Sequence, residues 1–175
     1  WRDRDLHHFQ HETFATFGFQ TSTWRRQRTR ARRRMLRWDG DATLAAYVAS
    51  AYNENGCREA LADPRMAYWL AEADRAPLGF ALAGYCKLPV EGLELGAGEL
   101  LQLYVRSAYQ NQGVGARLFD AALSWLESHY SPLYIGVWSK NLGAQRFYGR
   151  YGFAKVGEYG FPVGKTVDRE FILRR

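Results

Sequence analysis

The stretch Gln110-Asn111-Gln112-Gly113-Val114-Gly115 decides how the chain is organised. The run Glu99–Val105 before it is typical of a strand, and residues 116–127 after it have the apolar spacing of a helix. Glycines at the start of a helix leave its first main-chain N–H groups uncovered, and those groups have no partner within the helix. Because the helix dipole adds partial positive charge there, the sequence predicts a seat for an anion such as a phosphate. A tight turn without a ligand would use the same two glycines.

The composition is that of a folded globular chain, since 47% of the 175 residues are hydrophobic and 15% are aromatic. We expect a single domain over residues 1–175. No apolar run approaches the ~20 residues that span a bilayer, and no secretory signal pattern opens the chain, so we expect no membrane partner. Cys57 and Cys86 are far apart and lack a His/Cys metal-ligand spacing. This predicts free thiols, no metal site and a cytoplasmic location.

The net charge of +6 is concentrated in one atypical segment, residues 20–41. Eight arginines fall within thirteen positions of it: Arg25, Arg26, Arg28, Arg30, Arg32, Arg33, Arg34 and Arg37. Subtracting these eight charges from +6 leaves −2 for the rest of the chain. With Trp24 and Trp38 the segment could bind nucleic acid, but we prefer a solvated, mobile segment and expect no nucleic-acid partner. An out-of-frame stretch is a third explanation.

The remaining periodicity predicts an α/β chain with a mixed sheet. Residues 5–18 and 42–55 have helical spacing, with His7 and His11 one turn apart on the first helix but no third metal ligand nearby. The further predicted elements are, in order, strands 66–73, 78–88 and 99–105, helix 113–129, strand 133–137, helix 141–151, and strands 154–159 and 167–173. The helix over 113–129 connects two strands that should lie parallel and side by side.

Two blocks of sequence carry a resemblance to a known family. The first is Gln110-x-x-Gly113-x-Gly115 after Leu103-Tyr104-Val105, and the second is Val137-x-x-x-Asn141-x-x-Ala144-x-x-Phe147-Tyr148-x-x-Tyr151-Gly152-Phe153. Together they resemble the acetyl-CoA-binding signature of the GCN5-related N-acetyltransferases, the GNAT superfamily. The resemblance covers about residues 66–173. The last strands, with residues 157–164 and Asp168, are similar to the polyamine-acetyltransferase-like branch.

The resemblance implies a GNAT-like acyl-CoA N-acyltransferase fold. In it, a mostly antiparallel mixed sheet has flanking helices, and the parallel strands 99–105 and 133–137 splay apart. Acetyl-CoA would be the co-substrate, with its pantetheine arm in the gap and its pyrophosphate on the glycine loop. The implied cofactor-binding residues are Leu103, Tyr104, Val105, Gln110, Asn111, Gln112, Gly113, Val114, Gly115, Asn141, Ala144 and Tyr148. There are two departures: the family's first strand looks truncated, and Asn111 and Gln112 stand where a basic residue is common.

Acetyl transfer from a thioester to an amine requires a proton acceptor for the amine and a proton donor for the thiolate. We predict Glu99 as the acceptor, because some members of the family place a catalytic glutamate at the matching position. A surface glutamate at a strand edge is the alternative, with Glu91 or Glu94 as substitutes. Tyr148 matches the family's general-acid tyrosine, and a core aromatic is its alternative. A main-chain N–H within residues 103–105 would polarise the thioester carbonyl.

The function that follows is acetyl-CoA-dependent N-acetylation of a primary amine. The acceptor would be a small molecule, polyamine or amino-acid-like, or a protein or peptide amino group. The alternative is a catalytically weak CoA-binding or regulatory module that kept the fold. The sequence leaves open whether the chain forms a homodimer.

Overall fold

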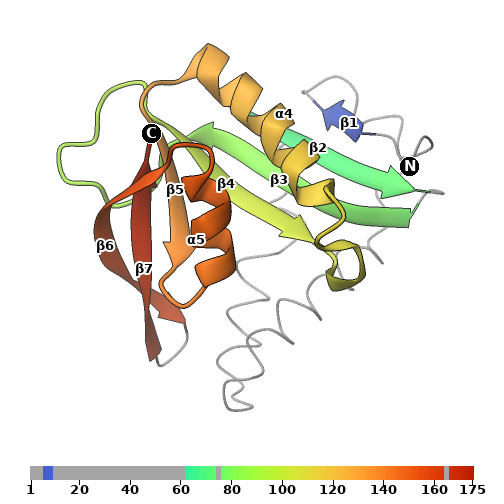
Figure 1. The fold of residues 1–175 in the computed structure, drawn as a ribbon. Helices are drawn as coiled ribbons and strands as arrows, with labels where there is room; N and C mark the ends of the chain where they lie inside the picture. Colours follow the sequence, from blue (N-terminus) through green and yellow to red (C-terminus); the bar gives the residue numbers. More distant parts are fainter. Residues whose placement is uncertain (1–5, 10–61, 74–75, 164–165) are drawn as a thin grey trace.

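The computed structural model describes residues 6–9, 62–73, 76–163 and 166–175. Its strands form one sheet in the order β1-β2-β3-β4-β5-β7-β6 (Figure 1). Along the chain the elements are β1 (Leu6–Phe9), β2 (Met66–Ala73), β3 (Ala76–Tyr85), β4 (Gly98–Val105), the 3-10 turn η1 (Ser107–Tyr109), α4 (Val114–His129), β5 (Leu133–Trp138), α5 (Leu142–Gly149), β6 (Ala154–Val163) and β7 (Thr166–Arg174). The mixed α/β sheet predicted from the sequence is confirmed.

Two neighbouring strands of this sheet, β4 and β5, separate from each other soon after they begin. They run parallel and pair only at Gly98 with Leu133 and at Glu99 with Tyr134, whereas the other neighbouring strands pair antiparallel along most of their length. Figure 1 shows the two strands diverging beyond that point. The predicted splay between residues 99–105 and 133–137 is therefore present.

An irregularity in β4 coincides with the point where the strands part. Leu100 pairs with Ala83 of β3, but Gln102 pairs with the adjacent Leu82, so Leu101 is an extra residue on the β4 side. An extra residue bends its strand and increases the local twist. The bulge therefore accounts for β4 turning away from β5 directly after Glu99.

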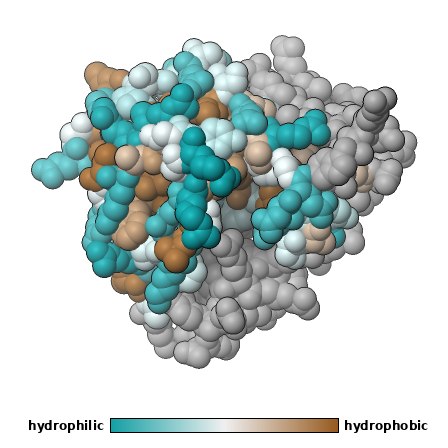
Figure 2. Space-filling model, in the orientation of Figure 1, coloured by the Kyte–Doolittle hydropathy of each residue, from teal (hydrophilic) through white to brown (hydrophobic). Residues whose placement is uncertain are grey.

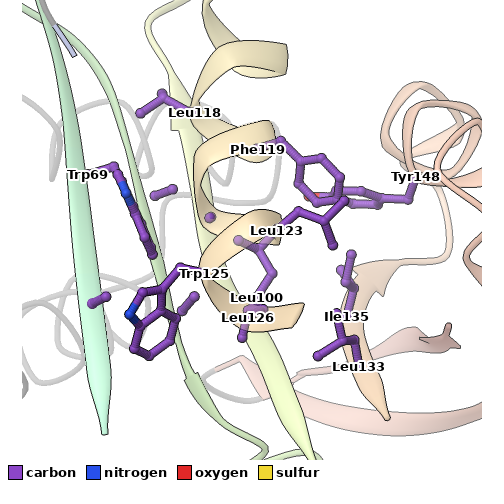
Figure 3. Packing of buried hydrophobic residues seen from close by; sticks show 14 of the residues in the cluster. Trp69, Leu100, Leu118, Phe119, Leu123, Trp125, Leu126, Leu133, Ile135 and Tyr148 are labelled. Atoms are coloured by element: carbon purple, nitrogen blue, oxygen red, sulfur yellow. The ribbon is translucent and has the colours of Figure 1, made fainter. Parts of the chain in front are cut away.

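The main core lies on the face of the sheet that α4 and α5 cover. Leu118, Phe119 and Leu126 of α4 are almost completely buried against that face. Figure 3 shows Phe119 of α4 beside Tyr148 of α5, with Trp69 and Trp125 on the side of α4 away from Tyr148. The outer surface of this side mixes hydrophilic side chains with small hydrophobic patches (Figure 2). Burial of one stripe of α4 thus fixes the helix over β2, β3 and β4.

The structure contradicts the helix predicted over residues 5–18. Leu6–Phe9 is instead the edge strand β1, which pairs antiparallel with β2 from Leu6 opposite Ala71 to Phe9 opposite Tyr68. A strand of four residues is therefore present at the edge of the sheet, ahead of β2. The hydrogen bonds that β2 offers along its edge outweigh the local helical spacing. Without that helix, His7 and His11 do not form the predicted pair one helical turn apart. Residues 10–61 lie outside the described residues, and they include the arginine segment and the helix predicted over 42–55.

Candidate active site

The first part of the site is the loop that leads from β4 into α4. Gly113 is the N-cap of α4 with φ of 79°, and Asn111 also has a positive φ, 59°. Such alternating backbone conformations turn consecutive N–H groups toward one concavity, and the first N–H groups of the helix have no intrahelical acceptor. No side chain of the described residues caps the helix. The loop therefore presents main-chain donors at the positive end of the helix dipole.

The side chains of the loop leave these donors uncovered. Gln110 Nε2 donates to the Val105 carbonyl at 3.0 Å, and Gln112 Nε2 donates to the Ala108 carbonyl at 2.8 Å. Both glutamines thus bond to carbonyls of the preceding turn and not to the N–H groups of the helix. Among the described residues, a methyl group at Gly113 would meet no atom within 4 Å. These contacts favour an anion seat over a turn closed by its own side chains.

The second part is the gap between β4 and β5, where the predicted residues 103–105 lie. Leu103 and Val105 pack against the core below α4, while Tyr104 is 40% exposed, with its ring 5.4 Å from that of Phe80. All three residues lie beyond the last paired residue of β4, Glu99. The ladder between β4 and β5 therefore ends before these residues.

The third part is α5, which begins at the residues of the second sequence block. Asn141 Oδ1 accepts the N–H of Ala144 at 3.2 Å, so Asn141 is the N-cap of α5. This hydrogen bond satisfies one donor of the first turn and fixes the direction in which the chain enters the helix. The cap sets the position of α5, and with it that of Tyr148, beside β5.

Tyr148 is buried among aromatic rings. Its ring centroid lies 5.4 Å from that of Phe119 and 5.3 Å from that of Phe147, and the residue is 8% exposed. Among the described residues its hydroxyl has no hydrogen-bond partner. Burial raises the pKa of the phenol well above its usual value, and the nearby Tyr104 adds to this increase. Tyr148 therefore keeps its proton at neutral pH.

Glu99 lies on the opposite face of the sheet, at the closed end of the gap. It is 7% exposed, and its Oε2 accepts the N–H of Lys87 at 2.7 Å. Burial raises the pKa of this carboxyl, while hydrogen bonds from the main chain of Lys87 and Leu88 and from the Cys86 thiol oppose the increase. A raised pKa brings a carboxylate closer to the range in which it accepts a proton at neutral pH. Glu99 is thus no exposed strand-edge glutamate.

The substitute carboxylate Glu94 is already paired with two other groups. Its side chain accepts the Tyr134 hydroxyl at 2.7 Å and forms an ion pair with Arg174, also at 2.7 Å. These partners lower the pKa of Glu94, the Tyr134 hydrogen bond most strongly. Glu91 is exposed in the loop between β3 and β4. Of the three candidate carboxylates, Glu99 is therefore the one that is buried at the closed end of the gap.

Sequence reasoning missed one carboxylate beside this gap, Glu170 on β7. Glu170 pairs across the sheet with Trp138 of β5, and its Oε2 accepts the Tyr159 hydroxyl at 2.8 Å. Burial raises the pKa of this carboxyl. The alternation Asp168, Glu170, Ile172 along the last strand is the signal that could have placed it on the same face as Tyr134.

The structure thus brings the predicted residues together around one gap. The glycine loop ends β4, Tyr148 lies on the α4 side, and Glu99 lies on the other face where β4 and β5 still pair. Within the described ranges no group of three or more His, Cys, Asp or Glu side chains could hold a metal ion. The helices described there include none with the length and apolar character that crossing a membrane requires.

Comparison with known proteins agrees with this geometry. The sequence profile of the Acetyltransferase (GNAT) family matches residues 21–153. An uncharacterised N-acetyltransferase of Lactobacillus delbrueckii subsp. lactis is 28% identical over 138 residues, which are 75% of this chain and 77% of that protein. The spermine/spermidine N(1)-acetyltransferase of Bacillus subtilis is 28% identical over 95 residues, which are 53% of this chain and 62% of that protein.

Solved structures show the same fold at low sequence identity. The PaiA N-acetyltransferase of Thermoplasma acidophilum, in complex with coenzyme A, has a TM-score of 0.71 at 15% identity and covers 98% of both chains. A GNAT-family acetyltransferase of Elizabethkingia anophelis with acetyl-CoA bound has a TM-score of 0.58 at 15% identity, over 98% of this chain and 97% of that chain. By fold and by sequence, this chain belongs to the GNAT family of acetyltransferases.

Proposed function

We propose that this N-acetyltransferase transfers the acetyl group of acetyl-CoA to a primary amine of a small cationic molecule. The observation that carries the proposal is the parted pair β4 and β5, which opens directly beside the uncovered N-terminus of α4. The partial similarity to a spermine/spermidine acetyltransferase supports a polyamine-like acceptor. A protein amino group as acceptor, a cytoplasmic location and a homodimer remain predictions.

The residues present fit the co-substrate. Acetyl-CoA supplies the acetyl group as an activated thioester, along with an anionic diphosphate and an amide-bearing arm. The N–H groups of residues 110–115 suit the diphosphate. The main chain of residues 103–105, which lies beyond the last β4 residue that pairs with β5, suits the amides as an added strand would. Arg106 and Arg117 are the described cationic side chains closest in sequence to the loop. Because neither Asn111 nor Gln112 is basic, we expect modest affinity for the diphosphate.

Glu99 is the proposed proton acceptor. A lysine-like ammonium has a pKa of ~10.4, so its deprotonation at pH 7 requires roughly 4–5 kcal/mol, and only the neutral amine attacks the carbonyl carbon. As the new C–N bond forms and the C–S bond breaks, the amine loses a proton, which Glu99 takes directly or through water. Its burial and its raised pKa suit it to this step.

Tyr148 is the proposed proton donor. The thiol of coenzyme A leaves as a thiolate unless a proton reaches its sulfur. The Tyr148 hydroxyl is protonated at neutral pH and, within the described part of the chain, is not bound to another protein group. It can therefore donate to the sulfur without first breaking a hydrogen bond. The apolar rings around it keep the site dry, which strengthens the interaction.

Acetyl-CoA binding and acetyl transfer test the proposal separately. Calorimetry should detect binding of acetyl-CoA, and mass spectrometry should detect the acetylated product when spermidine, lysine or an amino-terminal peptide is added. Binding without transfer to any amine would instead support the regulatory-module alternative. Absence of binding to acetyl-CoA would contradict both.

A pair of glycine substitutions tests the anion seat. Gly113 and Gly149 both have open space where a Cβ would lie, but only Gly113 has a positive φ. Gly113→Ala should weaken acetyl-CoA binding and destabilise the fold by about 1–2 kcal/mol, because L-residues disfavour this conformation. Gly149→Ala in α5 should leave binding unchanged and affect stability little. Equal binding constants for the two variants would contradict the role of the loop.

A further inference from the structure

The carboxylates on the two faces of the β6–β7 hairpin have different partners. On the α4 side, Glu158 forms ion pairs with Lys155 and Arg169, which lower the pKa of its carboxyl to about 2. On the other side, the partner of Glu170 is the neutral hydroxyl of Tyr159, and no cationic side chain of the described residues pairs with it. A partly buried carboxylate without a cation is an unfavourable arrangement in a folded protein.

Glu170 is positioned above β5 at the open part of the gap. A methyl group in place of a hydrogen of Gly136 would lie 3.4 Å from Glu170 Oε2, 3.4 Å from the Tyr159 hydroxyl and 3.0 Å from Leu88 Cδ2. The missing side chain at Gly136 therefore makes room for the carboxylate and the phenol. Gly136 is two residues past Tyr134, the last β5 residue that pairs with β4. The carboxylate thus lies where the two strands have parted.

Glu99 and Glu170 lie on the same face of the sheet, with Leu88 between them. Glu99 pairs with Tyr134 and Glu170 with Trp138, and these two residues of β5 share a face. The main chain of Leu88 hydrogen-bonds Glu99, and its side chain reaches Gly136. Because Glu170 Oε2 reaches back to Gly136, the two carboxylates are separated by about one strand spacing and two residues of rise along β5, which is on the order of 10 Å.

We propose that Glu170, oriented by Tyr159, binds a second ammonium group of the acceptor while the reacting amine lies near Glu99. This inference rests on the proposed function and specifies its substrate class as diamines and longer polyamines. A carboxylate held by a phenol is a charge-assisted acceptor for an ammonium donor. The bound ammonium supplies the cation that the described residues do not provide. Glu170 then selects acceptors with two positive charges over those with one.

The test compares two acceptors that differ only in the second ammonium, 1,7-diaminoheptane and 1-aminoheptane. For the diamine, Glu170→Gln should raise KM about 10-fold or more with little change in kcat, because the amide keeps the hydrogen bond to Tyr159 but loses the charge. The KM of the monoamine should change far less. Tyr159→Phe should also raise the KM of the diamine, by a smaller factor, because the carboxylate loses the hydrogen bond that orients it.

Glu158→Gln is the matched control, because it removes the same charge from the other face of the same hairpin. It should leave the KM and kcat of both acceptors unchanged. The inference is overturned if Glu170→Gln affects the two acceptors equally, if the wild type shows no preference for the diamine, or if Glu158→Gln reproduces the effect. In that case acetyl transfer to amines, and with it the proposed function, still stands.

A binding measurement separates the inference from turnover. Calorimetric titration of the CoA-bound protein with 1,7-diaminoheptane should show affinity that falls about 10-fold or more in Glu170→Gln, whether or not acetyl transfer occurs. If the wild type binds the diamine through Glu170 but transfers no acetyl group, the proposed function fails alone. If the wild type does not bind the diamine, the inference fails.

Discussion

The two faces of the central sheet bury different kinds of side chain. The face under α4 and α5 is apolar, with Phe119, Leu118 and Leu126 almost fully enclosed. The other face, between β3, β5 and β7, buries a carboxylate, Glu99, beside the thiol of Cys86. Apolar burial stabilises a fold, whereas burial of ionisable groups opposes it. We predict from this comparison that one face maintains the structure and that the other holds the reacting carboxylate, while the Tyr148 hydroxyl is a polar group on the apolar face.

The sharpest test of this difference is Glu99→Gln. If Glu99 accepts the proton of the amine, kcat should fall by about 10²–10⁴-fold while the protein stays folded. The kcat/KM of the wild type should also rise as the pH passes through the pKa of Glu99, because only the ionised carboxylate accepts a proton. Burial places this pKa above 4.5, the ordinary value for a glutamate. Steady-state kinetics across pH measures both effects.

Glu94→Gln is the matched control for that experiment. Glu94 lies in the preceding loop, where it pairs with Tyr134 and Arg174. We expect the rate of this variant to stay near that of the wild type. A large loss in Glu94→Gln with none in Glu99→Gln would transfer the role of base to Glu94.

The apolar face is tested by Phe119→Ala. Phe119 is 1% exposed and contacts the rings of Phe147, Tyr148 and Tyr151. Removing it leaves a cavity and should lower the free energy of unfolding by about 3–5 kcal/mol. Urea denaturation measures the change, and Phe119→Leu should lose much less because most of the volume is kept. A loss of rate without a loss of stability would break the division between the faces.

Helices and loops that depend on local signals could be predicted from the sequence, but the surroundings of individual side chains could not. The glycine loop, α4 and α5 follow from local signals, and the structure places them within a few residues of the predicted positions. Leu6–Phe9 was wrongly predicted as a helix because pairing with β2 decides its conformation, and a short local pattern does not contain that information. The roles given to the candidate site residues stay predictions.

Burial was the other property that the sequence left undecided. Glu99 reads equally as a base or a surface residue until β3 and β5 enclose it, since its burial comes from segments distant in the chain. The alternation along the last strand could place Glu170 on a face, but not its environment, which depends on Gly136 and Tyr159 in two other strands. Sequence periodicity places a side chain on a face, but tertiary contacts determine its solvation.

Tyr148→Phe sharpens the comparison because it removes the Tyr148 hydroxyl from the apolar face. Loss of the proton donor should lower kcat by about 10²-fold. Stability should change little, because the hydroxyl has no hydrogen-bond partner within the described ranges. Kinetics and urea denaturation of the same variant give both values. A variant that loses stability and keeps its rate would make Tyr148 a purely structural aromatic.

The smallest expected effect is a pH-dependent stability difference between the wild type and Glu99→Gln. Burial raises the pKa of Glu99 in the folded state, so the folded protein binds its proton more tightly than the unfolded chain does. The contribution of Glu99 to stability is therefore fully present below about pH 4.5 and is lost as the pH rises through the folded-state pKa. Glutamine does not ionise, so the variant should gain stability relative to the wild type over that interval. Because Glu170 is present in both proteins, its own raised pKa cancels in the difference. A stability difference that is flat in pH would show that Glu99 does not ionise against its surroundings, and the contrast between the two faces would then rest on packing alone.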